Sequence, residues 1–251
     1  MTKTLFFDIE TAPNMAYVWG QWQQDVIEHA REWYMLCFSY KWEGEKTTHV
    51  VSLEEFDLYS SDPENDFHVV EKLWELLDEA DVVIGHNSDA FDIKKANARF
   101  VYHDLGPTSH YQTVDTLKIA RRHFKFNSNR LGHLGEHLGL GGKEATGGFQ
   151  TWVGCMRGDV KAWRVMKKYA KQDVDLLVDV YERLRPWATT HPNRNVIDAT
   201  LHACPTCGSN QLHKRGARVT RTMTYQQYQC QRCRSYSRAR LAENVARPEV
   251  V

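Results

Sequence analysis

The chain of 251 residues is long enough for one substantial domain and a small appended module. Its composition, with 42% hydrophobic and 25% charged residues, is that of a soluble globular protein. The apolar residues between Lys3 and Asp8 are too few for a signal-peptide core, and no apolar run reaches membrane-spanning length. We therefore expect a cytoplasmic protein, encoded by a cell or a virus, that does not associate with a membrane.

The first predicted strand, LFFDIET, ends with two carboxylates that are two residues apart. Side chains alternate between the two faces of a strand, so Asp8 and Glu10 point to the same side. Two ionised carboxylates on one buried face repel each other unless a cation lies between them. Either the strand ends in solvent and both acids are hydrated, or they hold a divalent metal.

Strands and helices alternate along the chain that follows. Apolar runs and turn residues predict strands over 34–42, 47–52, 81–86 and 111–114. Helical spacing predicts helices within 62–80 and over 91–101, 115–124, 130–140 and 160–184, the third of them capped by Asp115. Early strands followed by alternating strands and helices predict an α/β domain with a mixed sheet flanked by helices.

The glycine-rich segment GLGGKEATGG, residues 139–148, is not a phosphate-binding P-loop. It lacks the Ser or Thr that would follow the lysine, and it does not connect a strand to a helix. We expect a mobile surface loop in which Lys143 contacts a phosphate.

The long helix carries an acid on its core side. Apolar residues recur at spacings of three and four and define the buried stripe. Its members are Trp163, Met166, Ala170, Val174, Leu177, Tyr181 and Leu184. At about 100° per residue, Asp173 falls inside this stripe, with Tyr169 at its edge one turn earlier. The acids Asp175 and Asp179 fall on the opposite face, which we expect to be solvated.

A second acidic stretch, GHNSDAFD, lies where a predicted strand runs into a helix. Asp89 and Asp92 both lie near the first helical turn, where one carboxylate commonly caps the helix. Asp89 is nearer the start and suits that role. We therefore expect Asp92 to face the strand end that carries Asp8 and Glu10.

Three segments together resemble the sequence motifs of the DEDD exonucleases, in the order in which that family shows them. They are FFDIET, HNSDAFD and YAKQD, and the resemblance spans roughly residues 5–184. The resemblance implies a ribonuclease H-like fold with Asp8, Glu10, Asp92 and Asp173 as ligands of two Mg²⁺ or Mn²⁺ ions. Asn87 also matches the second motif, whereas Asp89 does not. The third motif has the tyrosine form, so Tyr169 is implied as a catalytic residue.

The resemblance implies 3′-to-5′ removal of single nucleotides, with DNA the favoured substrate. Since a tyrosine hydroxyl with a pKa near 10 is a poor base, we expect Tyr169 to orient the attacking water. One alternative is the same chemistry on RNA, as in RNase D-type enzymes. Another is a nucleic-acid-binding accessory factor of a polymerase with a decayed site, against which the intact acids argue. A replication or repair protein is a further expected partner.

Two CxxC pairs near the C-terminus predict a structural zinc site. Cys204 and Cys207 are separated by 22 residues from Cys230 and Cys233, a pattern typical of a tetrahedral Cys₄ zinc ribbon. The intervening segment 219–229 reads as a hairpin. The expected organisation is an exonuclease domain over 1–187, a linker over 188–203, the ribbon over 204–240 and a tail over 241–251.

The predicted ribbon is strongly basic. Between Cys204 and Arg240 it has eight Lys and Arg residues and no Asp or Glu, although the whole chain has a formal charge of zero. This charge predicts contact with a nucleic acid backbone, for which we single out Arg215, Arg218, Arg232 and Arg234. The ribbon tyrosines, Tyr225, Tyr228 and Tyr236, either stack on unpaired bases or form the small core of the module.

Overall fold

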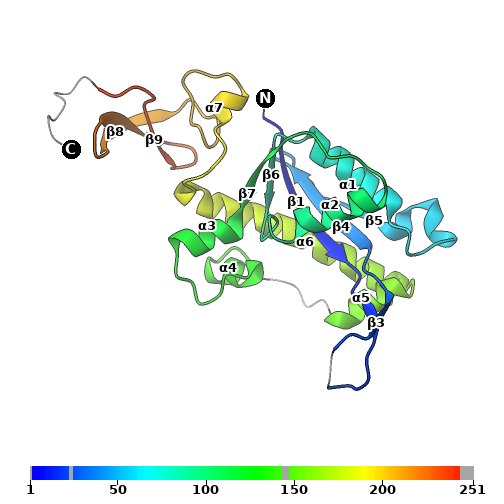
Figure 1. Ribbon diagram of the computed structural model, residues 1–251. Coiled ribbons are helices and arrows are strands. Elements are labelled where there is room, and N and C mark those ends of the chain that lie inside the picture. Colours follow the sequence, from blue (N-terminus) through cyan, green and yellow to red (C-terminus); the bar gives the residue numbers. More distant parts are fainter. Residues whose placement is uncertain (1, 23–24, 143–146, 244–251) are drawn as a thin grey trace.

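The computed structural model describes residues 2–22, 25–142 and 147–243. Its centre is a five-stranded sheet with the order β5-β4-β1-β6-β7 (Figure 1). The strands are β1 (Thr4–Thr11), β4 (Met35–Trp42), β5 (His49–Ser52), β6 (Val82–Gly85) and β7 (Gln112–Asp115). β1 pairs antiparallel with β4 and parallel with β6, so the sheet is mixed, as predicted.

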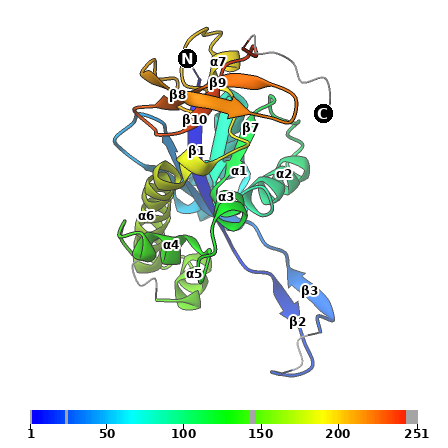
Figure 2. The same cartoon turned by 90° about the vertical axis from the view of Figure 1, so that its left-hand side faces the viewer.

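Helices cover both faces of the sheet (Figures 1 and 2). They are α1 (Phe67–Glu79), α2 (Asp92–Tyr102), α3 (Thr116–His123), α4 (Leu131–His137), α5 (Phe149–Met156) and α6 (Val160–Leu184). On β1, Phe7 and Ile9 pack in one hydrophobic cluster, whereas Phe6 packs in a second cluster against α6. Asp8 and Glu10 follow Phe6 on the α6 side because strand side chains alternate.

The predicted long helix is confirmed from its first residue to its last. Asp159 caps α6 by accepting the Lys161 backbone N–H. Every residue of the predicted stripe is buried, and Tyr181 packs edge-on against Phe6 with ring centroids 5.4 Å apart. Each large apolar side chain buried in this way stabilises the fold by about 1.5–3 kcal/mol. Asp173 lies within this stripe with only 4% of its surface exposed.

The expectation that Asp175 is simply solvated was wrong. Its carboxylate accepts hydrogen bonds from the Thr48 hydroxyl and from the ammonium groups of Lys41 and Lys171. Helical phase alone places Asp175 away from the apolar stripe, but the neighbouring edge of the sheet extends far enough to reach it. Asp179 is exposed, as predicted.

The expectation that Asp89 caps α2 was also wrong. The first helical residue is Asp92, no side chain caps this helix, and Asp89 instead pairs with Lys118 at 2.6 Å. The predicted cap of α3 is confirmed, since Asp115 accepts the backbone N–H groups of Leu117 and Lys118.

Some elements had no clear signal in the sequence. A hairpin of β2 (Met15–Tyr17) and β3 (Glu28–Arg31) projects from the sheet directly after β1 (Figure 2). Trp19 and Trp22 lie between its strands and are 90% and 89% exposed. Helix α5 and the short 3-10 helices η1 (Leu53–Glu55), η2 (Asp57–Ser60) and η3 (Arg185–Trp187) were likewise not predicted.

The C-terminal module is a three-stranded antiparallel sheet of β8 (Leu212–Val219), β9 (Thr224–Cys230) and β10 (Tyr236–Arg238). A hairpin is present, as predicted, but its first strand, β8, lies almost entirely before the predicted segment 219–229. β8 and β9 join through a turn closed by a Thr220–Met223 backbone hydrogen bond of 2.8 Å. The hydrophobic core of the module consists of its four cysteines, with Leu212 packed against them. So small an apolar core makes a bound metal the natural source of stability.

The segment before the ribbon is ordered and attached to the large domain. It contains α7 (Arg194–Ile197), and the buried Arg194 donates hydrogen bonds to Thr4 and Glu43. The backbone N–H of Arg194 also donates to Pro205 O at 2.8 Å. The ribbon therefore lies near the start of β1. No helix in the described ranges is long and apolar enough to cross a membrane.

Candidate active site and zinc site

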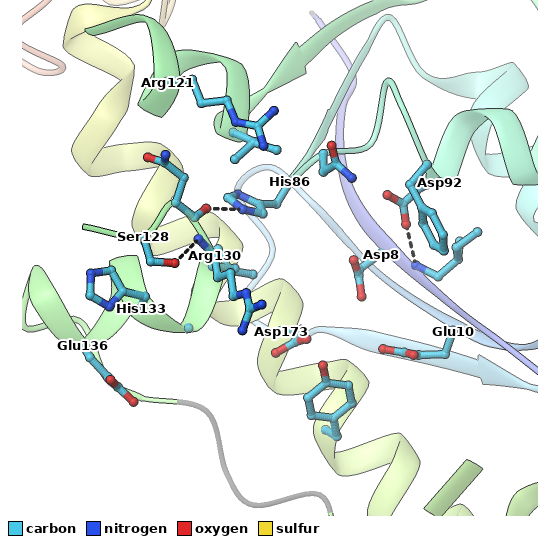
Figure 3. A pocket seen from close by; sticks show the side chains of 18 residues that line it. Asp8, Glu10, His86, Asp92, Arg121, Ser128, Arg130, His133, Glu136 and Asp173 are labelled. Carbon is cyan, nitrogen blue, oxygen red and sulfur yellow. Dashed lines mark hydrogen bonds between the residues drawn. The ribbon is translucent and has the colours of Figure 1, made fainter. Parts of the chain in front are cut away.

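A pocket of about 850 Å³ opens where the second half of β1 meets α6 and the ends of β6 and α3 (Figure 3). One wall carries the four acids and the tyrosine that the motifs select. The other wall carries cations and histidines. The polar residues that line it are Asp8, Glu10, Asp92, Asp173 and Tyr169 on the first wall, and His86, Asn87, Arg121, Ser128, Asn129, Arg130, His133 and Glu136 elsewhere.

Three carboxylates gather at the centre of the pocket. Asp8, Glu10 and Asp173 each offer one oxygen, and these oxygens all lie within 4.8 Å of one another. Asp173 is buried and the two β1 acids are half-buried, so solvent screens their repulsion only in part. An all-oxygen donor set of this charge fits a hard divalent cation such as Mg²⁺ or Mn²⁺.

Asp92 lies in the same pocket but outside this cluster. Its carboxylate accepts the backbone N–H of Ile9 at 3.2 Å and is 3% exposed. Burial raises the pKa of Asp92 to about 6, although the hydrogen bond from Ile9 opposes the shift. The start of α2 therefore meets the second half of β1, as predicted. In this arrangement the Asp92 carboxylate is hydrogen-bonded to the β1 backbone.

Tyr169 points into the pocket one turn before Asp173. Its ring packs edge-on against Trp152 of α5, with centroids 5.9 Å apart. Burial, followed by the negative charges of Asp173 and Glu10, raises the pKa of Tyr169 well above its ordinary value. The hydroxyl therefore keeps its proton at neutral pH and can donate a hydrogen bond, but it cannot act as a base.

The opposite wall contains residues that sequence reasoning missed. Nε2 of His86 donates to the Asn129 carbonyl at 2.9 Å, which fixes the imidazole at the pocket edge. Arg121 and Arg130 also line the pocket (Figure 3). The sequence feature that could have indicated this cationic wall is the absence of any acid between Asp115 and Glu136.

Asn87 lies beside His86 in the left-handed conformation, with φ of 67°. Asparagine tolerates this region better than most residues. Its backbone N–H donates to Asp115 at 2.9 Å, which ties the second motif to the cap of α3. Lys143, the predicted phosphate contact in the glycine-rich loop, lies outside the described residues.

The four ribbon cysteines form a second candidate metal site. Their sulfur atoms all lie within 4.8 Å of one another, with Sγ–Sγ distances of 3.6 Å for Cys204–Cys233 and for Cys207–Cys230. Zn–S bonds of about 2.3 Å in a tetrahedron place sulfurs about 3.8 Å apart. This geometry fits a zinc ribbon. Arg215, Arg218, Arg232 and Arg234 are exposed on the same module.

The fold agrees with what comparisons with known proteins show. A sequence model of the RNase_H superfamily matches residues 5–185. The chain belongs to the RNase_H superfamily. Among solved structures, the superfamily domain is similar to part of the family B DNA polymerase from the hyperthermophilic archaeon Pyrobaculum calidifontis, with a TM-score of 0.55 and 16% identity. The match covers 74% of this chain but only 25% of that polymerase. A comparison with curated proteins found no match.

Replacing Asp92 by asparagine should stabilise the protein at neutral pH. A buried acid with a raised pKa favours the native state when protonated, so wild-type stability should fall as pH rises from about 4 to about 6. Asp92→Asn should lack this fall and exceed wild type by on the order of 2 kcal/mol at pH 7.5. Urea unfolding without added Mg²⁺ or Mn²⁺ measures this difference, and equal pH profiles would contradict it.

Proposed function

We propose that this chain is a metal-dependent 3′-to-5′ exonuclease of the tyrosine branch of the DEDD family, acting on DNA. The observation that carries the proposal is the convergence of Asp8, Glu10 and Asp173 within 4.8 Å, although Asp173 is more than 160 residues away along the chain. Superfamily membership and the polymerase-like fold support a nuclease. All the motif residues are intact, which speaks against a decayed accessory factor.

The chain's own side chains suggest how a phosphodiester would be held. Asp8, Glu10 and Asp173 would hold one metal ion, and Asp92 would contribute to a second. When bound, two such ions would supply an activated water and stabilise the leaving oxygen. The protonated hydroxyl of Tyr169 would orient that water. Arg130 and Arg121 face these carboxylates across the pocket, where they can bind the non-bridging oxygens of the phosphate.

A labelled-oligonucleotide assay tests the activity, the polarity and the substrate together. The full chain is incubated with 5′-labelled DNA or RNA, single- or double-stranded, in Mg²⁺, Mn²⁺ or EDTA. We expect a metal-dependent ladder that shortens from the 3′ end, fastest on DNA. A single internal product would instead indicate an endonuclease, and faster RNA cleavage would favour the RNase D-like alternative.

The two faces of α6 provide a matched pair of variants for this assay. Asp173→Asn should reduce the rate by more than about 10³-fold because it removes a ligand from a site built around charge. Asp179→Asn makes the same chemical change on the exposed face of the same helix and should retain the wild-type rate. Equal rates for the two variants would refute the assignment of Asp173. Asp175 is not a suitable control, because it holds β4 to α6.

The role of the tyrosine can be tested separately. Tyr169→Phe keeps the ring that packs against Trp152 and removes only the hydroxyl. We expect a loss of about 10²-fold in rate with little change in stability, which is the scale of a positioning effect. The pH dependence of the residual rate should match that of wild type, since the hydroxyl does not titrate near neutrality. A fully active variant would exclude Tyr169 from catalysis.

We further propose that the zinc ribbon binds nucleic acid. Arg218→Gln combined with Arg232→Gln removes two exposed charges without touching a cysteine. Binding of long DNA should weaken, and the slope of log affinity against log salt should become shallower by roughly 1.4–1.8. Measuring zinc content confirms that the ribbon stays folded. An unchanged salt slope would indicate that the ribbon docks another protein instead.

A further inference from the structure

Most cations in the segment after Asp115 have no counter-ion among the residues that the structure describes. Residues 116–135 contain no Asp or Glu. Lys118 pairs with Asp89, but Arg121, Arg122, Lys125 and Arg130 are exposed and make no ion pair or side-chain hydrogen bond with any residue that the structure describes. We call these four residues the basic strip.

Helix stability accounts for only part of the basic strip. Arg121 and Arg122 lie in the last turn of α3, where a cation is favoured by the helix dipole. Lys125 and Arg130 lie beyond the end of that helix, so the dipole does not explain them. Solubility is a weak explanation as well, because soluble surfaces usually intersperse charges of both signs.

A chain of aromatic rings runs beside the basic strip. Trp187 contacts Phe124 with ring centroids 5.3 Å apart, and Phe124 stacks on Phe126 at 5.0 Å. Phe126 then contacts His137 at 5.5 Å, and His137 stacks on His133 at 5.9 Å. His133 lines the active-site pocket, whereas Trp187 lies at the far end of α6 and is 49% exposed. The rings therefore connect the end of α6 to the pocket.

The ribbon lies near the end of this row of rings that carries Trp187. Figures 1 and 2 show the ribbon next to the C-terminal end of α6. Its Cys230–Cys233 turn carries the exposed Arg232. Trp187 follows Arg185 by two residues in η3. A cationic and aromatic surface thus extends from the ribbon to the carboxylates.

We propose that the basic strip and its rings bind the sugar–phosphate backbone and bases of a single nucleic acid strand on its way from the ribbon to the active-site pocket. The inference rests on the proposed exonuclease function. Phosphates complement the unpaired cations, and bases stack on aromatic rings only where they are not paired with a second strand. DNA and RNA share this chemistry, so we expect the basic strip to bind both without discriminating between them.

The geometry sets a minimum substrate length for this surface. Arg194 anchors the ribbon segment at Thr4, and Glu10 lies six residues further along β1. At about 3.3 Å per residue, the two ends are about 20 Å apart. A strand whose bases stay stacked, with nucleotides about 3.4 Å apart, needs about six of them to span this distance. Much shorter strands can occupy the pocket with little contact to the ribbon.

The test uses two cations of the strip that do not line the pocket. Arg122→Gln combined with Lys125→Gln is compared with Lys46→Gln combined with Lys161→Gln, which removes the same charge from exposed positions elsewhere. Fluorescence anisotropy measures binding of labelled single-stranded DNA and RNA of 4 to 20 nucleotides to the full zinc-loaded chain. No Mg²⁺ or Mn²⁺ is added, so binding is measured without cleavage.

For wild type, affinity should increase with oligonucleotide length and should still increase beyond about six nucleotides. The strip variant should bind the 20-mer about tenfold more weakly, with a salt slope shallower by roughly 1.4, and the 4-mer almost normally. The control variant should stay within about twofold of wild type. A strip variant with wild-type affinity and salt slope overturns the proposal. An equal loss of affinity for blunt-ended duplex DNA and for single strands would also overturn it. If the strip variant binds weakly but wild type hydrolyses nothing in Mg²⁺ or Mn²⁺, strand binding by the basic strip is supported and the exonuclease proposal fails.

Discussion

Electrostatic repulsion among Asp8, Glu10 and Asp173 is the constraint on which the rest of the structure depends. The native fold brings the three carboxylates within 4.8 Å because β1 is the central strand and α6 packs across it. The contact between Phe6 and Tyr181 and the hydrogen bond from Ser39 to Ala170 O, 2.7 Å long, hold the helix against the sheet. Apolar packing thus maintains a concentration of negative charge that a divalent cation would neutralise.

The proposed nucleic acid substrate is a polyanion that these carboxylates repel, and the chain carries much of its positive charge elsewhere. The eight ribbon cations are balanced by an excess of acids elsewhere in the chain. The ribbon lies near the start of β1 and the carboxylates lie in its second half, and the basic strip follows from the last turn of α3 to the pocket edge at Arg130. In the proposed function, these positive surfaces would attract a strand from a distance, and a bound metal would neutralise the acids where the strand meets them.

Several features were predictable because they depend on local periodicity. The limits of α6 follow from its apolar stripe, the cap of α3 follows from Asp115, and the Cys₄ site follows from the CxxC spacing. Asp173 could be selected as the unusual acid because a helix fixes the direction of each side chain relative to its neighbours. The fold class followed from the order of strands and helices.

Contacts between distant segments were beyond such reasoning. Helical phase could not show that Lys41 and Thr48 reach Asp175, or that Asp89 would find Lys118 instead of capping α2. The approach of Asp92 to the Ile9 backbone, and of Arg194 to Thr4, likewise depends on how the sheet and helices pack. The sequence by itself determined which residues carry chemistry and the local elements that hold them, since both depend on neighbours within a few positions. Only the tertiary structure decided which of those side chains meet, because long-range packing sets the distances between their charges.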